Sequence, residues 1–535
     1  MVLSSARCRA ATLSRAHAIA AVSVAALLAG CAVGPDFVAP QAPATKDYEF
    51  GGTPQPSVEN AADAQQHFSM GKKISGDWWQ LFHSPQLDGV LQQAIAGNQT
   101  LVTAQATVAQ AQQGIAQASG ALWPQVDLAA GAHRERINLA SVGVNAPSPI
   151  INLFSIGPTL SYAVDPFGGN RRRVEQQEAV TQFQAYQLDA AYLTLTGGAA
   201  TQAVQIASAR AQLQAVDAII ADDERNLDLV SSQRKAGEAT QLEVQLAESQ
   251  LATDRTLLPP LRQQISVARH ALAILVGKAP GDWAPPDFDL AEFTLPQDLP
   301  VTLPSELVRQ RPDILASEAQ LHAASAAVGV ATAQLYPNLT LSASFTQESL
   351  KPSTLFNPAA SIFDVGANLL APVFHGGALR AQKQAAVDAF DGALATYRQT
   401  VLTSFGQVAD TLQALAHDAE LLEAQRRALE SAETSLRLTR TTFRYGNVGI
   451  LQVLDAQRQA EQARLGYVRA QAQRYLDSIT LFTAMGGGWR DWQAQTGSRD
   501  GGEVRRHALS RRWGPVHGTI LPVSAVRRFR QCDVG

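Results

Sequence analysis

Side chains that could carry out covalent or acid–base chemistry are sparse in this sequence. Its 535 residues include ten histidines and three cysteines, and these show neither the spacing of metal ligands nor that of a nucleophile with its base. The sequence also lacks a Gly-x-Ser-x-Gly elbow, a phosphate-binding loop and a His-Glu-x-x-His pair. We therefore expect no enzyme, no metal site and no bound cofactor.

Cys31 has the clearest chemical role, and that role is modification. Residues 1–30 combine three arginines, no acid, an apolar run over 18–29 and the ending Leu-Ala-Gly directly before Cys31. The ending resembles the lipobox of bacterial lipoproteins, in which the cysteine receives a diacylglycerol and an acyl chain after the signal is removed. A spanning helix needs about twenty apolar residues, so we interpret the shorter run as a signal and not as an anchor.

Charge and cysteine usage narrow the class of protein. The formal net charge is −4, although arginines are concentrated in the signal and after residue 489, so the body between them is more acidic. An acidic body has no electrostatic reason to bind nucleic acid, and we expect no such partner. Cys8 would leave with the signal, so the exported chain has no disulfide framework and must be stabilised by packing and assembly.

An internal repeat with a period of about 210 residues organises the chain. The two copies share three landmarks in the same order: residues 121–128 match 334–341, residues 166–169 match 372–377, and residues 234–244 match 444–453. Each copy predicts a helix, a pair of strands, a long helix, a tight turn and a returning helix.

The repeat divides the chain into five parts. We predict a signal peptide (1–30), a lipidated extended segment (31–83), a first repeat (84–303), a second repeat (304–489) and an Arg-rich tail (490–535). The tail shows no pattern, and we expect it to be disordered.

Four segments alternate between apolar and polar residues and predict half-polar strands. They lie near 125–133, 155–165, 338–346 and 362–371. Backbone groups inside a bilayer must all be paired, and small barrels need about eight strands, so several copies of the chain would have to contribute. Three copies would supply twelve strands. The alternative is two amphipathic hairpins packed on a soluble core.

The helical segments are too long for an ordinary globule. We predict long helices over 172–277 and 378–486, and residues 172–232 contain no proline, which allows a helix of roughly 90 Å. Residues 401–422 carry an apolar heptad seam for packing against adjacent helices, in a helical tube or, alternatively, in a closed bundle. Pro259-Pro260 predicts a break that the second copy lacks.

Several stretches together resemble the outer-membrane efflux protein family. They are Cys-Ala-Val-Gly-Pro-Asp-Phe at 31–37, Trp-Trp-Gln-Leu-Phe at 78–82, Asn-Gln-Thr-Leu at 98–101, Leu-Pro-Ser-Glu-Leu at 303–307 and Arg-Pro-Asp-Ile at 311–314. The resemblance is to the lipoprotein branch that serves resistance-nodulation-division (RND) pumps and shares the TolC fold. It implies a mainly α protein with membrane β-strands, in which a homotrimer forms a twelve-stranded β-barrel continued by a long α-helical barrel.

The resemblance also implies a function and partners. The chain would be the outer-membrane channel subunit of a tripartite efflux pump, giving small molecules such as drugs or toxic compounds an exit duct across periplasm and outer membrane. Its partners would be two further copies, a periplasmic adaptor protein, an inner-membrane pump of the RND type and outer-membrane lipid. A duct for metal ions or for secreted polypeptides remains an alternative within the class.

Residues 445–458 match the family's periplasmic tip motif. By resemblance, Leu451 forms an apolar ring and Asp455 an acidic ring that close the duct, and Arg458 can pair with Asp455. Position 452 is Gln, so we expect a single acidic ring. Gly446 and Gly449 are expected in turn conformations that other residues resist. Adaptor contacts are expected at the two tips, at Gly237, Leu242, Gly446, Val448, Gly449 and Ile450.

The strongest alternative from another class is a periplasmic coiled-coil adaptor or scaffold lipoprotein. Such a protein would share the signal, the lipid and the helices, but it would lack strands with one apolar face. The four alternating segments argue against it.

Overall fold

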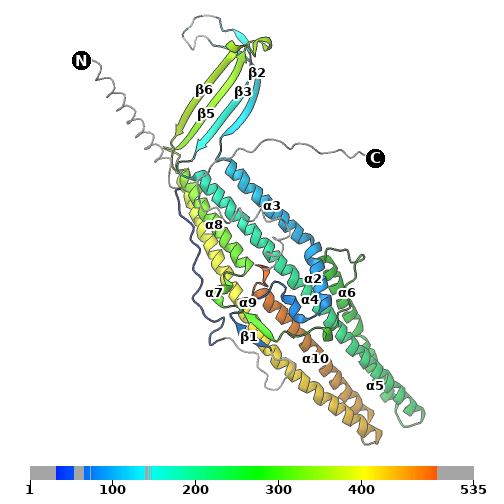
Figure 1. The fold of residues 1–535 in the computed structure, drawn as a ribbon. Coiled ribbons are helices and arrows are strands. Elements are labelled where there is room, and N and C mark those ends of the chain that lie inside the picture. Colours follow the sequence, from blue (N-terminus) through cyan, green and yellow to red (C-terminus); the bar gives the residue numbers. More distant parts are fainter. Residues whose placement is uncertain are drawn as a thin grey trace.

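The computed structural model describes residues 32–52, 66–72, 74–138, 143, 145 and 147–490. The predicted signal, Cys31 and the tail from residue 491 lie outside the described residues. A four-stranded sheet stands at one end of a layer of long helices, and two helical hairpin tips form the opposite end (Figure 1).

Two helices run most of the length of this layer. α4 (Gly169–Lys235) and α9 (Ala378–Arg444) contain 67 residues each, which corresponds to roughly 100 Å. Both are free of proline, and each begins after a glycine with positive φ, 76° at Gly168 and 86° at Gly377. Such glycines let the chain turn sharply from strand into helix.

The remaining long helices complete two matching repeats. α3 (Gln99–Gly120) and α8 (Pro312–Ala333) have 22 residues each and lead into the strands. After the first tip the chain returns as α5 (Gln241–Arg255) and α6 (Leu258–Leu275), and after the second as the unbroken α10 (Ile450–Ala484). The break expected at Pro259-Pro260 is confirmed, as is a fold of long helices and strands in two repeats.

The sheet has the strand order β2-β3-β5-β6, and all neighbouring strands are antiparallel. Its strands are β2 (Gln125–Arg136), β3 (Ile150–Val164), β5 (Asn338–Ser349) and β6 (Ser361–Leu370). β3 starts five residues before the predicted 155, and β2 and β5 end three residues beyond their predicted ends. Pairing with a neighbouring strand extends regular structure past the point where the apolar alternation stops.

The main core lies beside the middle of the helices and is built partly from the segment predicted as extended. There β1 (His67–Met70) pairs in parallel with β4 (Asp298–Val301), and η1 (Trp78–Phe82) packs with α2 (Pro85–Gly97). Aromatic side chains fill this core: Trp78, Phe82, Tyr475 and Phe482. The shorter elements α7 (Pro304–Leu307), η3 (Leu290–Glu292), η4 (Pro352–Thr354) and η5 (Pro358–Ala360) connect the larger ones.

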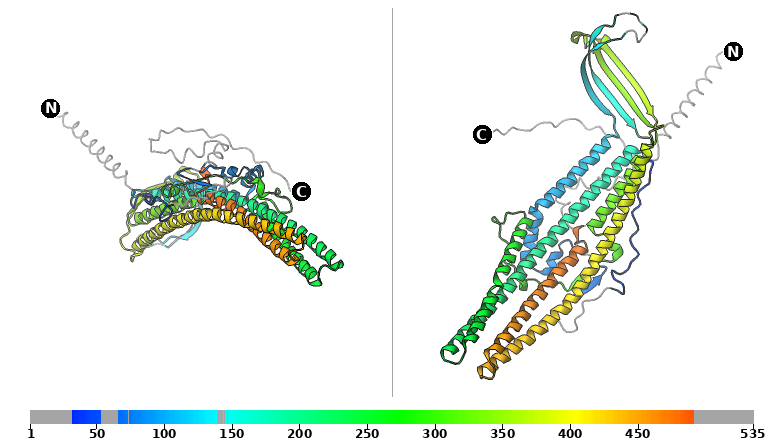
Figure 2. Two further views of the ribbon diagram at one scale, coloured as in Figure 1. Left: turned by 90° about the horizontal axis from the view of Figure 1, so that it is seen from below. Right: turned by 180° about the vertical axis from the view of Figure 1, so that it is seen from behind.

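The helices lie side by side in a single curved layer. Seen from below, in the left view of Figure 2, they follow an arc and do not close on themselves. In the described part of the chain, no helix is both long enough and apolar enough to cross a membrane.

Candidate functional site

The register of the sheet collects apolar side chains on one face. In the pairing of β5 with β6, Leu339 is opposite Leu369, Leu341 opposite Ala367, Ala343 opposite Val365 and Phe345 opposite Phe363. The intervening pairs are polar or small, for example Thr340 with Asn368. Because successive side chains point to opposite faces, one face is apolar and the other polar.

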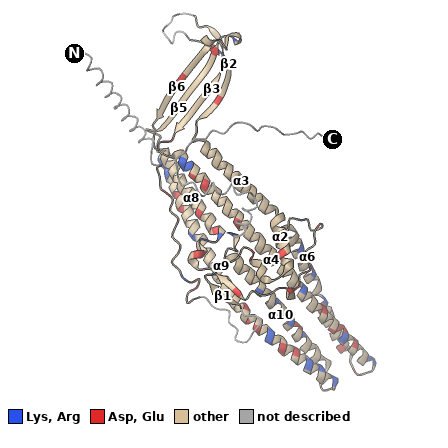
Figure 3. Cartoon of the chain, in the orientation of Figure 1, with Lys and Arg blue, Asp and Glu red and all other residues tan. Residues whose placement is uncertain are grey.

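The apolar face is uncovered in the single chain. Phe363 and Val365 are each 77% exposed, and Phe345 is 51% exposed. Figure 3 shows that charged residues are frequent along the helices and rare along the sheet. An uncovered apolar sheet face with few charges suits contact with lipid and not with a soluble core. This contradicts the alternative of hairpins packed on a soluble core.

The N-terminal segment is held next to the base of this sheet by Arg172. Arg172, only 4% exposed, donates to Asp36 Oδ1 at 2.7 Å and to the backbone oxygens of Val33 and Gly34 at 3.3 Å. Gly34 has φ +96°, and a Cβ there would lie 2.5 Å from the Cα of Gly329, so only glycine fits. Residue 32 therefore lies beside the junction of the sheet and the helices, which was not evident from the sequence.

The second helical tip adopts the turn expected for one of its two glycines. Gly446 has φ 74°, its N–H donates to Phe443 O at 2.8 Å, and the N–H of Asn447 donates to Thr442 O at 3.1 Å. Gly449, in contrast, precedes α10 with φ −83° and ψ 170°, a conformation open to any residue. The expectation for Gly449 is wrong, because the chain has completed its reversal before this position.

The first tip is closed in a similar way. Gly237 has φ 81°, and its N–H donates to Arg234 O at 3.0 Å. Thr240 and Glu243 then form a reciprocal capping box at the start of α5, with the Thr240 N–H donating to Glu243 Oε2 at 2.6 Å. These hydrogen bonds lower the pKa of the Glu243 carboxyl.

The residues predicted at the gate lie on one exposed face of α10. Leu451 is 51% exposed, and the Asp455 side chain, one turn further on, is 52% exposed. Arg458 donates to Asp455 Oδ1 at 2.5 Å, which confirms the expected pair, and Gln459 donates to Asp455 Oδ2 at 2.8 Å. Both of these partners belong to the same helix as Asp455.

The expected adaptor-contacting residues differ in accessibility. Leu242 is 67% exposed, the glycines 237, 446 and 449 are exposed, and Val448 is half-buried. Ile450 is only 3% exposed, because it packs with Val230, Val244 and Val453 between the two hairpins. The prediction of Ile450 as a contact residue is therefore corrected: its side chain belongs to the packing between the tips.

Polar contacts above the tips hold the two hairpins side by side. Arg440 of α9 donates to Asp222 Oδ2 of α4 at 3.0 Å and to Gln457 Oε1 of α10 at 3.2 Å. Further from the tips, Arg469 of α10 donates to Gln212 of α4 at 2.8 Å. Separation of the hairpins would break these contacts, which the sequence alone did not reveal.

Comparison with known proteins agrees with this architecture. Residues 90–278 and 303–487 match the family described as "Outer membrane efflux protein". The pyoverdine export outer membrane protein OpmQ of Pseudomonas aeruginosa is 33% identical over 452 residues, covering 82% of this chain and 94% of OpmQ. A probable outer membrane lipoprotein, SilC of Salmonella typhimurium, is 25% identical over 475 residues, covering 88% of this chain and 98% of SilC. The solved outer-membrane channel OprN aligns with a TM-score of 0.77 at 26% identity, over 86% of this chain and 100% of OprN.

Proposed function

The chain belongs to the outer membrane efflux protein family, and from this premise we propose how it assembles, closes and finds its partners. It is the outer-membrane channel of an efflux system, its helices extend into the periplasm, and it is not an enzyme. The proposal concerns its trimer, its lipid, its gate and its cargo.

Three copies close the duct. β2 and β6 are the edges of the four-stranded sheet, so each has one side without a strand partner in the described chain. The unpaired backbone N–H and C=O groups of such edges cannot face lipid. Pairing β6 of one copy with β2 of the next gives the backbone groups of both edges hydrogen-bond partners. The curvature of the helical layer in Figure 2 supports the same closed arrangement for the helices.

Cys31 carries the lipid. The Leu-Ala-Gly-Cys sequence supports this, as does the similarity to a probable outer membrane lipoprotein. The anchoring of Val33 and Gly34 by Arg172 supports it independently, since it holds this part of the chain, two and three residues after Cys31, near the base of the sheet. A diacylglycerol and an acyl chain at this level would enter the inner leaflet of the outer membrane.

The gate lies at Leu451 and Asp455. The observation that carries this proposal is their half-exposed position on one face of α10, where the two hydrogen-bond donors to Asp455 in the described chain belong to the same helix. In a trimer, this face would present three leucines and three carboxylates to the duct near its periplasmic end. The exposed residues of both tips, Gly237, Leu242, Gly446, Val448 and Gly449, would contact the periplasmic adaptor, and the adaptor would connect the channel to an inner-membrane RND pump.

The cargo is a small molecule that the pump selects. OpmQ exports pyoverdine, and other relatives are described for cations or toluene, so similar channels serve different compounds. We assign the channel the exit step and the pump the choice of compound.

Conductance in planar bilayers tests the pore and the gate together. We expect the purified wild-type protein to show a small, mostly closed conductance. We expect Asp455→Ala to raise it several-fold, because the substitution removes the three carboxylates that narrow the duct. Leu242→Ala, at the first tip and outside the proposed ring, serves as a control with unchanged conductance. Equal conductance of the wild type and Asp455→Ala would refute the gate, and no conductance from correctly folded trimers would refute the duct.

A further inference from the structure

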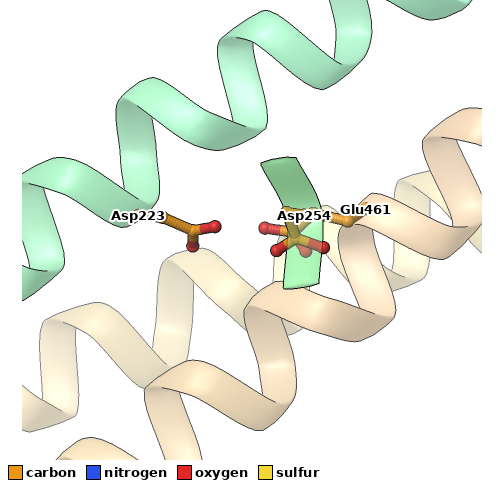
Figure 4. A group of neighbouring side chains, drawn as sticks. All are labelled: Asp223, Asp254 and Glu461. Carbon is orange, nitrogen blue, oxygen red and sulfur yellow. The ribbon is translucent and has the colours of Figure 1, made fainter. Parts of the chain in front are cut away.

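Three carboxylates from three different helices meet between the two helical hairpins, as Figure 4 shows. Asp223 comes from α4, Asp254 from α5 and Glu461 from α10. Their side chains are 2%, 7% and 9% exposed, respectively, and one oxygen atom of each lies within 4.8 Å of the other two. This acidic triad lies roughly 20 Å from the helical tips and is separate from the proposed gate.

Amide side chains orient the triad from outside. Gln457 Nε2 donates to Asp223 Oδ1 at 2.6 Å, and Gln250 Nε2 donates to Asp254 Oδ2 at 2.7 Å. The other oxygen of Asp223, Oδ2, and the Oε1 atom of Glu461 are buried and accept no hydrogen bond from the residues that the structure describes. Each of these two side chains therefore holds a buried acceptor atom at the triad that no donor within the described chain satisfies.

The charges around the triad do not neutralise it. Arg440 of α9 is the cation that acts on Glu461, but its guanidinium bonds Asp222 and Gln457. Asp222 adds a further negative charge nearby. Several buried carboxylates without a paired cation are costly, so the triad needs positive charge from another source.

We propose that Asp223, Asp254 and Glu461 bind a divalent cation that prefers oxygen ligands, Ca²⁺ or Mg²⁺. Two oxygens bound to one Ca²⁺ at about 2.4 Å lie at most about 4.8 Å apart, and the three carboxylate atoms meet this limit. The bonds from Gln457 and Gln250 are the outer contacts that commonly orient ligating carboxylates. Water would complete the coordination sphere.

The bound cation joins α10 to α4 and α5. It thereby adds a link between the hairpins to the contacts of Arg440 and Arg469. Any effect of this link on channel opening depends on the proposed gate, whereas binding of the cation does not. The test below therefore measures binding and stability, and its result is independent of the conductance experiment.

Calorimetric titration and thermal unfolding of the full-length, detergent-solubilised protein test the site. The chelator-treated protein is titrated with CaCl₂ and with MgCl₂, and its melting temperature is measured with and without millimolar amounts of each salt. We expect one ion per chain and a higher melting temperature in the presence of the ion that binds, since binding to the folded state stabilises it. We expect Asp223→Asn to weaken binding on the order of 100-fold or more.

The control has the same charge change on the same helix. Asp228 is exposed on α4 five residues from Asp223, and we expect Asp228→Asn to bind the cation as the wild type does. Glu461→Gln is the second test variant should Asp223→Asn not fold. The proposal is overturned if neither cation binds to or stabilises the wild type. It is also overturned if Asp228→Asn weakens binding as much as Asp223→Asn, or if lowering the pH stabilises the protein while neither cation does. The last result would mean that the triad holds protons only.

Discussion

At the tip between α9 and α10, two glycines three residues apart have different backbone conformations. Gly446 has φ 74°, a value that side chains disfavour, whereas Gly449 has φ −83°. The N–H groups of Gly446 and Asn447 satisfy the last carbonyls of α9. Only Gly446 is thus required by the turn, and Gly449 serves as the residue before α10.

We predict that Gly446→Ala destabilises the second tip by about 1 kcal/mol, because alanine resists a positive φ. Gly449→Ala is the matched control, since its backbone suits any residue and a Cβ there would meet only the flexible end of Gln452, at 3.2 Å. Amide hydrogen exchange at Asn447 measures the difference. Exchange that accelerates equally in both variants would contradict the assignment of the turn to Gly446.

At the scale of elements, a pair of carboxyl groups further from the tip, Asp418 and Asp477, links α9 to α10. Burial and a hydrogen bond with Asp477 raise the pKa of Asp418 to about 8, and nearby Arg474 opposes this shift. The protonated form of Asp418 is therefore favoured in the folded protein. Because the pKa in the folded protein exceeds the ordinary value near 4, the folded state holds a proton that the unfolded state releases.

We predict that this contact makes the protein less stable as the pH rises from about 4 to about 8, the interval between the unfolded and folded pKa values of Asp418. Asp418→Asn removes the titrating group, so its melting temperature should fall less between pH 6 and pH 8.5, as measured in chelator-treated buffer. Asp410→Asn makes the same substitution at an exposed position on α9 and should keep the wild-type slope. An unchanged slope in Asp418→Asn would show that the pair does not hold this proton in the folded state.

At the scale of the whole molecule, the sheet and the helical layer of one chain form an open, curved surface that does not close on itself. The sheet has two free edges and one uncovered apolar face, and the helices form an open arc (Figures 1 and 2). Burial of the sheet therefore depends on lipid outside and on further copies at its edges. The trimer proposed above meets both needs.

We predict that Val365→Lys on β6 impairs membrane assembly, whereas Asn368→Lys does not. Val365 is 77% exposed on the apolar face, and a lysine facing the bilayer midplane costs about 2–4 kcal/mol. Asn368 pairs with Thr340 on the polar face, where a lysine stays in water. Heat-resistant trimers in outer-membrane fractions are the measure. Loss of trimers with Asn368→Lys alone would assign the lipid to the opposite face.

Much of the architecture follows from local sequence. The proline-free stretch around 172–232, the alternation over 338–346 and the double proline at 259–260 each specify an element through its own period or through a lost amide donor. The 210-residue repeat then specifies the order of elements twice. The Asp455–Arg458 pair was also predictable, because residues three apart on a helix are neighbours.

Contacts between distant elements were decided only by the tertiary structure. The burial of Ile450 and the pairing of β1 with β4 depend on where separate segments meet. The acidic triad brings together residues up to 238 positions apart, so the expectation of no metal site, made from local spacing, could not take it into account. Local periodicity determines which face of a helix is apolar, but only the packing of long helices against one another determines which residues of two such faces lie at the same height.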